Sequence, residues 1–158
     1  MNELYWILWG LVVLLSANAL GFFLSYAIVI GKLFNWFLRN DRATELNSVY
    51  PLFRVAEDPV TPYIACLASQ MIASMAFLAC AFVLQRANLL TLLPTLAIPA
   101  FLAIHFGSGL GASEKAVLTG TASEDETTKY LRLNIPLHRG YAIIMGLAAV
   151  SALRAPFV

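Results

Sequence analysis

Three long runs without any Asp, Glu, Lys or Arg divide this chain: residues 4–31, 59–85 and 87–113. Each run is 27 or 28 residues long, whereas about 20 apolar residues in a helix are enough to cross a bilayer core of roughly 30 Å. A helix also satisfies its own backbone hydrogen bonds, as hydrocarbon requires. We therefore predict three membrane-spanning helices, over about 4–31, 60–85 and 88–111.

A fourth and shorter uncharged segment, residues 140–153, lies between Arg139 and Arg154. At 1.5 Å per residue it makes only about 21 Å of helix. It can still cross if both arginines extend their side chains toward the headgroups. Asn134 as an N-cap, with Pro136 in the first turn, would lengthen the helix. We predict a fourth span over about 135–156 on this basis.

These segments predict an all-α fold, an antiparallel bundle of four transmembrane helices that forms one integral membrane domain over residues 1–158. Short interfacial helices are expected in the two long loops. Apolar residues spaced i, i+3, i+4 and i+7 from Leu46 to Phe53 favour a helix on the membrane surface, bent or ended by Pro51. Ser123 and Glu126 have the spacing of a capping box.

The distribution of Lys and Arg predicts the orientation. Loops 32–58 and 114–139 carry eight of these residues, and the opposite side carries only Arg86 and Arg154. The positive-inside rule then makes both loops cytoplasmic and both termini external. Residues 16–19 resemble a signal-peptidase site, but the apolar run continues past them, which favours an uncleaved first helix.

Composition agrees with a membrane protein and excludes one class of partner. Hydrophobic residues make up 60% of the chain and charged residues 12%, about half the charged fraction of soluble domains. The net charge is +1 and no basic cluster occurs, so no nucleic-acid partner is expected. Lipid is therefore the first partner that the sequence predicts.

Polar side chains gather toward the loop ends of the third and fourth spans. His105 lies inside the third span, and Asn134, His138 and Tyr141 share one face of the fourth helix. Ionisable groups within a span are costly and are candidates for function by default. His105 and His138 are thus the candidate catalytic residues. The candidate ligand-binding residues are Asn47, Asn134, Arg139 and Tyr141.

Other roles for these residues remain open. His105 can form a hydrogen bond between helices, act as a base toward an apolar substrate, or bind a metal or pigment-like cofactor axially. Two histidines without a metal-binding spacing are weak evidence for a metal, because zinc sites use three or four protein ligands. No metal ligand is assigned and the cofactor is unknown. Arg139 is either an anchor at the membrane surface or a clamp on a substrate.

Two parts of the chain carry a further pattern. The first part is Gly21–Phe22–Phe23–Leu24–Ser25–Tyr26, followed by Glu45–Leu46–Asn47 and Phe53. The second is Tyr130–Leu131–Arg132–Leu133–Asn134, followed by Arg139 and a helix rich in Ala and Gly. Both parts resemble the anthrone-oxygenase-like family of small four-helix membrane proteins. The resemblance implies a four-helix fold and oxygenase activity on an anthrone. Small glutathione-metabolising membrane enzymes also have four spans, but their Arg-x-x-x-Asn-x-x-Glu signature is absent.

Two classes of function follow for this membrane protein. One is an oxygenase, or a binding protein, for a planar hydrophobic molecule such as an anthrone or a quinone. The other is a non-catalytic accessory subunit that packs against a larger membrane complex. Its evidence is the number of helix faces with small residues, because such faces let membrane helices approach closely. The first span has such a face at Gly10, Ala17, Asn18, Gly21 and Ser25.

Overall fold

The computed structural model describes residues 1–158, all of the chain, as seven α-helices without a strand. A π-helical turn, η1 (Tyr26–Ile30), joins the first two helices, and a 3-10 turn, η2 (Ala155–Phe157), follows the last. The α-helices are α1 (Asn2–Ser25), α2 (Gly31–Arg39), α3 (Ala43–Glu57), α4 (Val60–Val83), α5 (Leu89–Ser108), α6 (Leu110–Thr119) and α7 (Glu124–Arg154).

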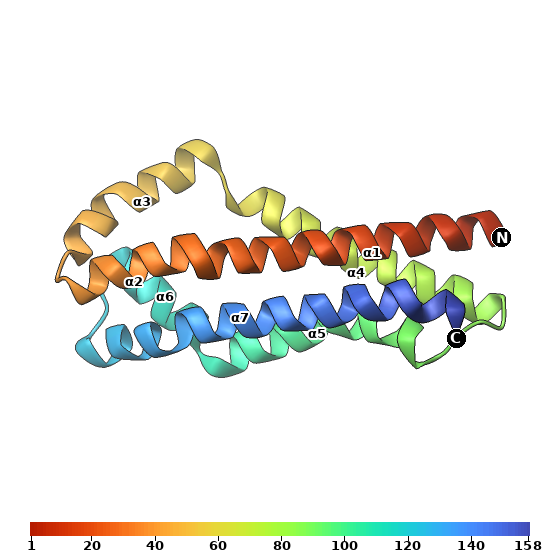
Figure 1. Cartoon of the computed structure of the whole chain (residues 1–158). Helices are drawn as coiled ribbons and strands as arrows, with labels where there is room; N and C mark the ends of the chain where they lie inside the picture. The colour runs from red at the N-terminus through yellow and green to blue at the C-terminus, as the bar shows by residue number, and fades with distance from the viewer.

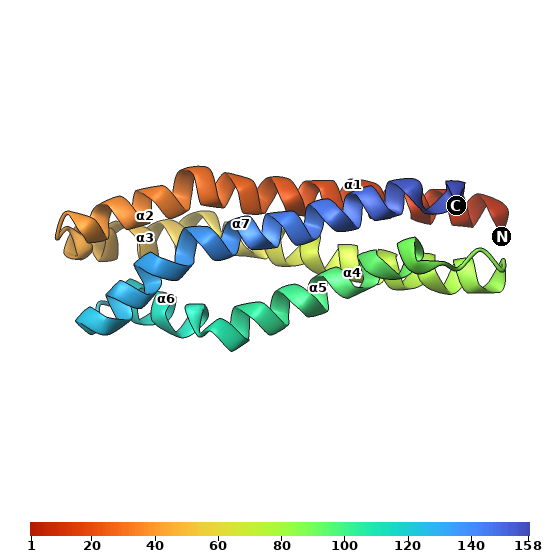
Figure 2. The same ribbon diagram turned by 60° about the horizontal axis from the view of Figure 1, so that its bottom comes forward.

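Four long rods run along one axis and form an antiparallel bundle (Figure 1). By length and composition all four can cross a membrane: Asn2–Arg39, Val60–Val83, Leu89–Ser108 and Glu124–Phe157. Both chain termini lie at the same end of the bundle, and α2, α3 and α6 lie at the other end (Figures 1 and 2). The predicted all-α bundle with four apolar helices is confirmed.

The fourth long helix starts well before the predicted position. α7 has 31 residues and begins at Glu124. Its capping box is formed: the Glu126 amide donates to Ser123 Oγ at 3.2 Å, and the Ser123 amide donates to Glu126 Oε2 at 2.8 Å. The expectation that Asn134 caps this helix is wrong, because Asn134 lies in its interior. Pro136 is also internal, because the helix begins at the capping box upstream and continues past the proline.

The two long loops contain the expected short helices. α3 begins at Ala43 and continues through Pro51 to Glu57, so the proline does not end it. The glycine-rich stretch after His105 ends α5, with Gly109 in a left-handed conformation at φ 72°. A new helix, α6, starts immediately after it and ends at Gly120, which has φ 69°.

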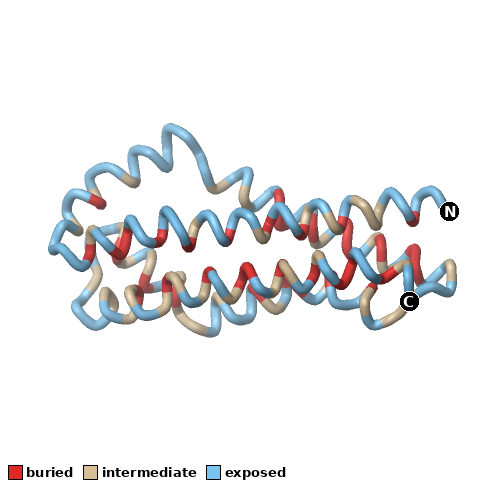
Figure 3. Tube along the Cα trace, viewed as in Figure 1, coloured by how far each residue is buried: buried red, intermediate tan, exposed pale blue.

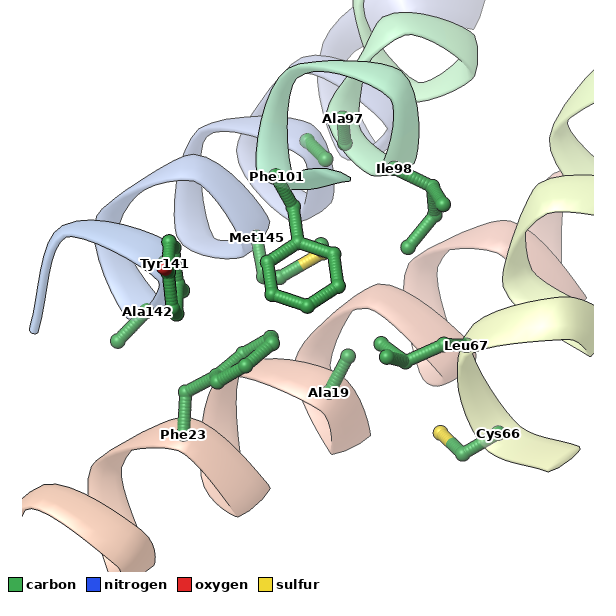
Figure 4. Close-up of a cluster of buried hydrophobic side chains, with 11 residues drawn as sticks. Ala19, Phe23, Cys66, Leu67, Ala97, Ile98, Phe101, Tyr141, Ala142 and Met145 are labelled. Carbon is green, nitrogen blue, oxygen red and sulfur yellow. The ribbon is translucent and has the colours of Figure 1, made fainter. Parts of the chain in front are cut away.

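Buried side chains line the inside of the bundle in three clusters along its axis. The central cluster joins α1, α4, α5 and α7, and its aromatic rings Phe23, Phe101 and Tyr141 point toward one another (Figure 4). One cluster near the termini includes Tyr5 and Phe77. The third, around Phe34 and Tyr130, attaches α3 and α6 to the bundle.

The outside of the bundle is apolar too. Only 37 of the 158 residues are buried, and large apolar side chains such as Leu14, Ile72 and Ile143 are more than half exposed. Exposed residues cover the outer surfaces of all the long helices (Figure 3). Soluble proteins rarely expose contiguous apolar patches larger than a few hundred Å². The apolar exterior of this bundle therefore fits contact with lipid.

Candidate functional site

Both histidines lie beside the central aromatic cluster, toward the loop end of the bundle. His105 comes from α5 and His138 from α7, and the Tyr141 ring lies between them. The ring centroid of Tyr141 is 6.1 Å from that of His105 and 5.5 Å from that of His138. Phe23 of α1 also contacts this group, with its centroid 5.3 Å from that of Tyr141. Three helices thus bring together the two candidate catalytic histidines and Tyr141.

His138 is held in a defined orientation. Its ring stacks on Tyr26 with centroids 3.8 Å apart and planes 17° from parallel. Its Nδ1 lies 2.7 Å from the backbone carbonyl oxygen of Asn134. A carbonyl oxygen can only accept, so Nδ1 carries the hydrogen and donates. The neutral imidazole therefore has its lone pair on Nε2, the atom that can take a proton.

His105 is held less tightly. Its Nδ1 lies 3.4 Å from the Tyr141 hydroxyl oxygen, a long contact in which either group can donate. On its other side, a Cβ at Gly111 would approach His105 Nε2 to 3.1 Å. The absence of a side chain at Gly111 therefore lets the first turn of α6 lie against the imidazole. Through this contact His105 lies at the junction of α5, α6 and α7.

Asn134 connects α7 to the long first rod. Its Nδ2 donates to Asn35 Oδ1 at 3.0 Å and to the Gly31 carbonyl oxygen at 3.3 Å. Its own Oδ1 is buried without a partner. A Cβ at Gly31 would meet Tyr26 Cε1 at 3.1 Å and Asn134 Nδ2 at 3.4 Å. A side chain at position 31 would thus press first on the Tyr26 ring, which stacks on His138.

The π-helical turn lies next to these contacts. η1 begins at Tyr26, whose ring covers His138 and whose hydroxyl oxygen is 3.4 Å from that of Tyr130. It ends where Gly31 donates its amide to the Tyr26 carbonyl oxygen, five residues back. Single π turns within α-helices occur frequently at functional sites. The π turn is therefore a further reason to place the candidate site in this region.

The other two predicted site residues lie elsewhere. Asn47 of α3 lies at the far end of α6, where a Cβ at Gly120 would meet its Nδ2 at 3.1 Å. Gly120 lies nine positions after Gly111, which corresponds to about 13 Å of helix. Arg139 is exposed and lines a groove between α1 and α7. The structure therefore brings together His105, Asn134, His138 and Tyr141, but not Asn47 or Arg139.

Polar residues in the middle of the bundle have structural partners. Gln70 is fully buried, and its Nε2 lies 3.2 Å from Ser16 Oγ, 3.1 Å from Ser74 Oγ and 3.1 Å from the Pro94 carbonyl oxygen. Its partners come from α1, α4 and α5, so it connects three spans.

Two residues beside the site were missed in the sequence. Tyr26 was noted only as part of a family-like motif, although it covers His138. Glu114 of α6 was not considered at all. Burial raises the pKa of its carboxyl group, with Arg54 and the Tyr26 hydroxyl acting in the opposite direction. Its position directly after the neutral run 87–113 was the available signal.

No group of three or more His, Cys, Asp or Glu side chains in the chain could hold a metal ion. Two open hollows on the surface are not lined by either histidine. One is the α1–α7 groove beside Arg139, of about 390 Å³, and the other, of about 340 Å³, lies around Asn88 between α4 and α5.

Comparisons with protein-family models, with curated proteins and with solved structures found no match to this chain.

Proposed function

We propose that this membrane protein is a small oxygenase that acts on a planar hydrophobic molecule of the anthrone type, bound beside His138 at the loop end of the bundle. The observation that carries the proposal is the fixed tautomer of His138. Its Nδ1 donates to a backbone carbonyl oxygen at 2.7 Å, so the basic Nε2 belongs to an oriented neutral imidazole.

The surroundings of His138 suit a flat aromatic substrate. Tyr26, Phe23 and Tyr141 place three aromatic rings around the imidazole. Rings of this kind stack on, or pack edge-to-face against, a polycyclic ligand. The ligand would take the place that Tyr26 now occupies on the imidazole face, and a rotation of the Tyr26 side chain would open that place.

The reaction requires one base and dioxygen. The methylene carbon of an anthrone loses a proton to His138 Nε2, and its electron pair passes into the ring as an enolate. The enolate carbon then adds O₂, and the resulting peroxide loses water to leave a carbonyl group. The balance is R₂CH₂ + O₂ → R₂C=O + H₂O, in which carbon is oxidised, O₂ is reduced, and His138 returns its proton to the departing water.

The test uses the full chain in lipid vesicles, with an anthrone as substrate and O₂ consumption and quinone absorbance as readouts. His138→Phe keeps a ring against Tyr26 but removes the base. It is expected to lower the rate by about 100-fold or more, the usual effect of losing a general base. Vesicles without protein give the spontaneous rate of oxidation.

His105→Leu is the matched variant, because it removes the other imidazole from the same cluster. A modest loss is expected, since His105 contacts Tyr141 rather than the reacting atom. Quinone formation at the wild-type rate by His138→Phe would contradict the proposal, as would a wild-type rate no faster than that of vesicles without protein.

A different observation favours the second candidate function, that of an accessory subunit. Asn18 lies in the middle of the first span and is exposed. The one hydrogen bond of its side chain runs from Nδ2 to Cys66 Sγ at 3.6 Å. Ala17, Gly21 and Ser25 on the same side of α1 are also exposed, and a Cβ at Gly21 would meet nothing within 4 Å. A helix of a partner protein would satisfy the amide and use this small-residue face.

Extraction in a mild detergent tests this second function. An accessory subunit is expected to migrate with a larger complex, and Asn18→Leu with Gly21→Leu should release it. Ile72→Ala, an exposed residue of α4 outside this face, is the control. Migration of the wild-type chain as a lone monomer would eliminate the subunit function.

A further inference from the structure

The groove between α1 and α7 combines an apolar floor with a single cation. Leu20, Leu24, Ala27 and Ile28 of the first rod form one wall, and Ala142, Ile143 and Gly146 of α7 form the other. Arg139 is the only charged residue that lines it. The groove has a volume of about 390 Å³ and opens to the outside of the bundle.

Arg139 has no partner for its charge within the protein. It is exposed, and the one salt bridge in the chain joins Arg42 and Glu45. The acidic residues of its own helix, at positions 124–126, lie at the start of α7, about 20 Å away along the helix. The guanidinium group is therefore free for an anion from outside the chain.

The depth of Arg139 fits the boundary between acyl chains and headgroups. Arg154 lies fifteen positions after it, which corresponds to about 22 Å of helix. Tyr26 of the first rod stacks on His138, which directly precedes Arg139. Tyr26 and Arg139 therefore lie at about the same depth. Lys32 lies six residues beyond Tyr26, about 9 Å further toward the loop end. An extended arginine at this depth reaches the phosphate layer.

We infer that this groove binds one phospholipid with a net negative headgroup, whose phosphate contacts Arg139 and one of whose acyl chains lies along the groove. Charge complementarity identifies the occupant. The groove offers one unpaired guanidinium group and otherwise apolar side chains, which together complement an anionic amphiphile. The site is separate from His138, because Arg139 points to a different face of α7. It does not depend on the proposed oxygenase function.

Native mass spectrometry of the full chain tests the inference. The protein in detergent is titrated with phosphatidylglycerol or with phosphatidylcholine of identical acyl chains. The wild type should bind the first phosphatidylglycerol about fivefold more tightly, as expected for one basic residue near the membrane surface. Arg139→Gln should abolish this preference, and Arg139→Lys should retain most of it.

Three further variants complete the design. Arg132→Gln removes another exposed arginine of α7 outside the groove and should keep the preference. Gly146→Leu fills the groove and should weaken the first binding event for both lipids. Leu24→Trp fills the same groove from the opposite wall, and replaces Gly146→Leu if that variant does not fold.

Three results would overturn the inference. One is equal wild-type affinity for the two lipids. Another is an undiminished preference in Arg139→Gln. The third is full lipid affinity in the variant that fills the groove.

Discussion

At the scale of single residues, Asn134 is a buried polar residue whose side chain is only partly hydrogen-bonded. It is fully buried, donates two hydrogen bonds and leaves its own oxygen without a partner. A buried donor or acceptor left unpaired costs about 1–3 kcal/mol. The Asn134 amide therefore acts mainly by satisfying Asn35 on the first rod.

The corresponding prediction is a loss of stability. Asn134→Leu removes both donors and leaves Asn35 Oδ1 buried without a partner, so the free energy of unfolding should fall by about 1–3 kcal/mol. Denaturation in mixed detergent micelles measures it. Asn35→Ala should also destabilise, and the double variant should lose less than the sum, because each change removes the same bond. Additive losses would mean that the bond contributes nothing.

Glu114 gives the protein a pH dependence outside the spans. Burial raises the pKa of its carboxyl group in the folded protein. Its contribution to stability is then fully present below the ordinary carboxyl pKa and is lost as the pH rises through the raised value. Arg54 reduces this effect without reversing it.

Glu114→Gln should therefore raise the melting temperature at about pH 8, far above the ordinary carboxyl pKa, by more than at about pH 4, where the wild-type carboxyl group is protonated. Thermal unfolding in detergent at several pH values measures the difference. Glu57→Gln, an exposed carboxyl group at the end of α3, is the control and should show no such trend. A larger gain at low pH than at high pH would contradict the assigned sign.

At the scale of elements, the π-helical turn sets the register of the first rod. Buried residues Ala19, Phe23, Ala27 and Gly31 follow one another at intervals of four. Each such interval advances a straight α-helix by about 40°, so three of them would rotate the buried face by about 120°. A π turn holds more residues per turn and offsets this rotation. It keeps Gly31 and Asn35 directed at α7.

Deletion of Ile28, an exposed residue within the turn, should convert it to regular α-helix and leave Gly31 within about 20° of its present direction, because eleven residues at 100° each complete about three turns from Ala19. Gly31 and Asn35 then keep their buried positions, and we expect only a modest drop in the folded fraction, measured by unfolding in detergent and by near-ultraviolet circular dichroism. Deletion of Leu14, an exposed residue in the regular part of α1, rotates the two parts of the helix by about 100° relative to each other and should cause a large drop. Equal stability of the two deletion variants would show that the π turn has no role in register.

At the scale of the whole molecule, the orientation in the membrane stays a prediction from charge alone. The two long loops carry eight Lys and Arg residues, and the opposite end carries two. The structure adds that both termini lie at one end of the bundle (Figure 1). If the positive-inside rule holds, the termini are external.

Single-cysteine labelling tests the orientation after Cys66 and Cys80 are replaced by Ala. Neither forms a disulfide, and alanine is only slightly smaller than cysteine, so the replacement should preserve the fold. A membrane-impermeant maleimide added to intact cells should label Val158→Cys, and should label Thr121→Cys only after the cells are permeabilised. The reverse pattern would invert the topology.

The sequence alone determined the solvent of this protein and the number of its long helices. Hydrophobicity adds up along a segment, so the neutral runs and the capping residues at Ser123 and Glu126 predict helices without knowledge of their neighbours. The sequence also placed His105, Asn134, His138 and Tyr141 in one region, because helix periodicity and depth suffice for that.

Only the tertiary structure decided which way each helix faces. Lipid and the bundle core are both apolar, so the spans have no clear polar side that would show their rotation. For that reason the sequence could not separate Arg139, which lines the outer groove, from its neighbour His138, which stacks on Tyr26. The tautomer of His138 and the register set by the π turn depend on the same rotations, which packing between helices fixes.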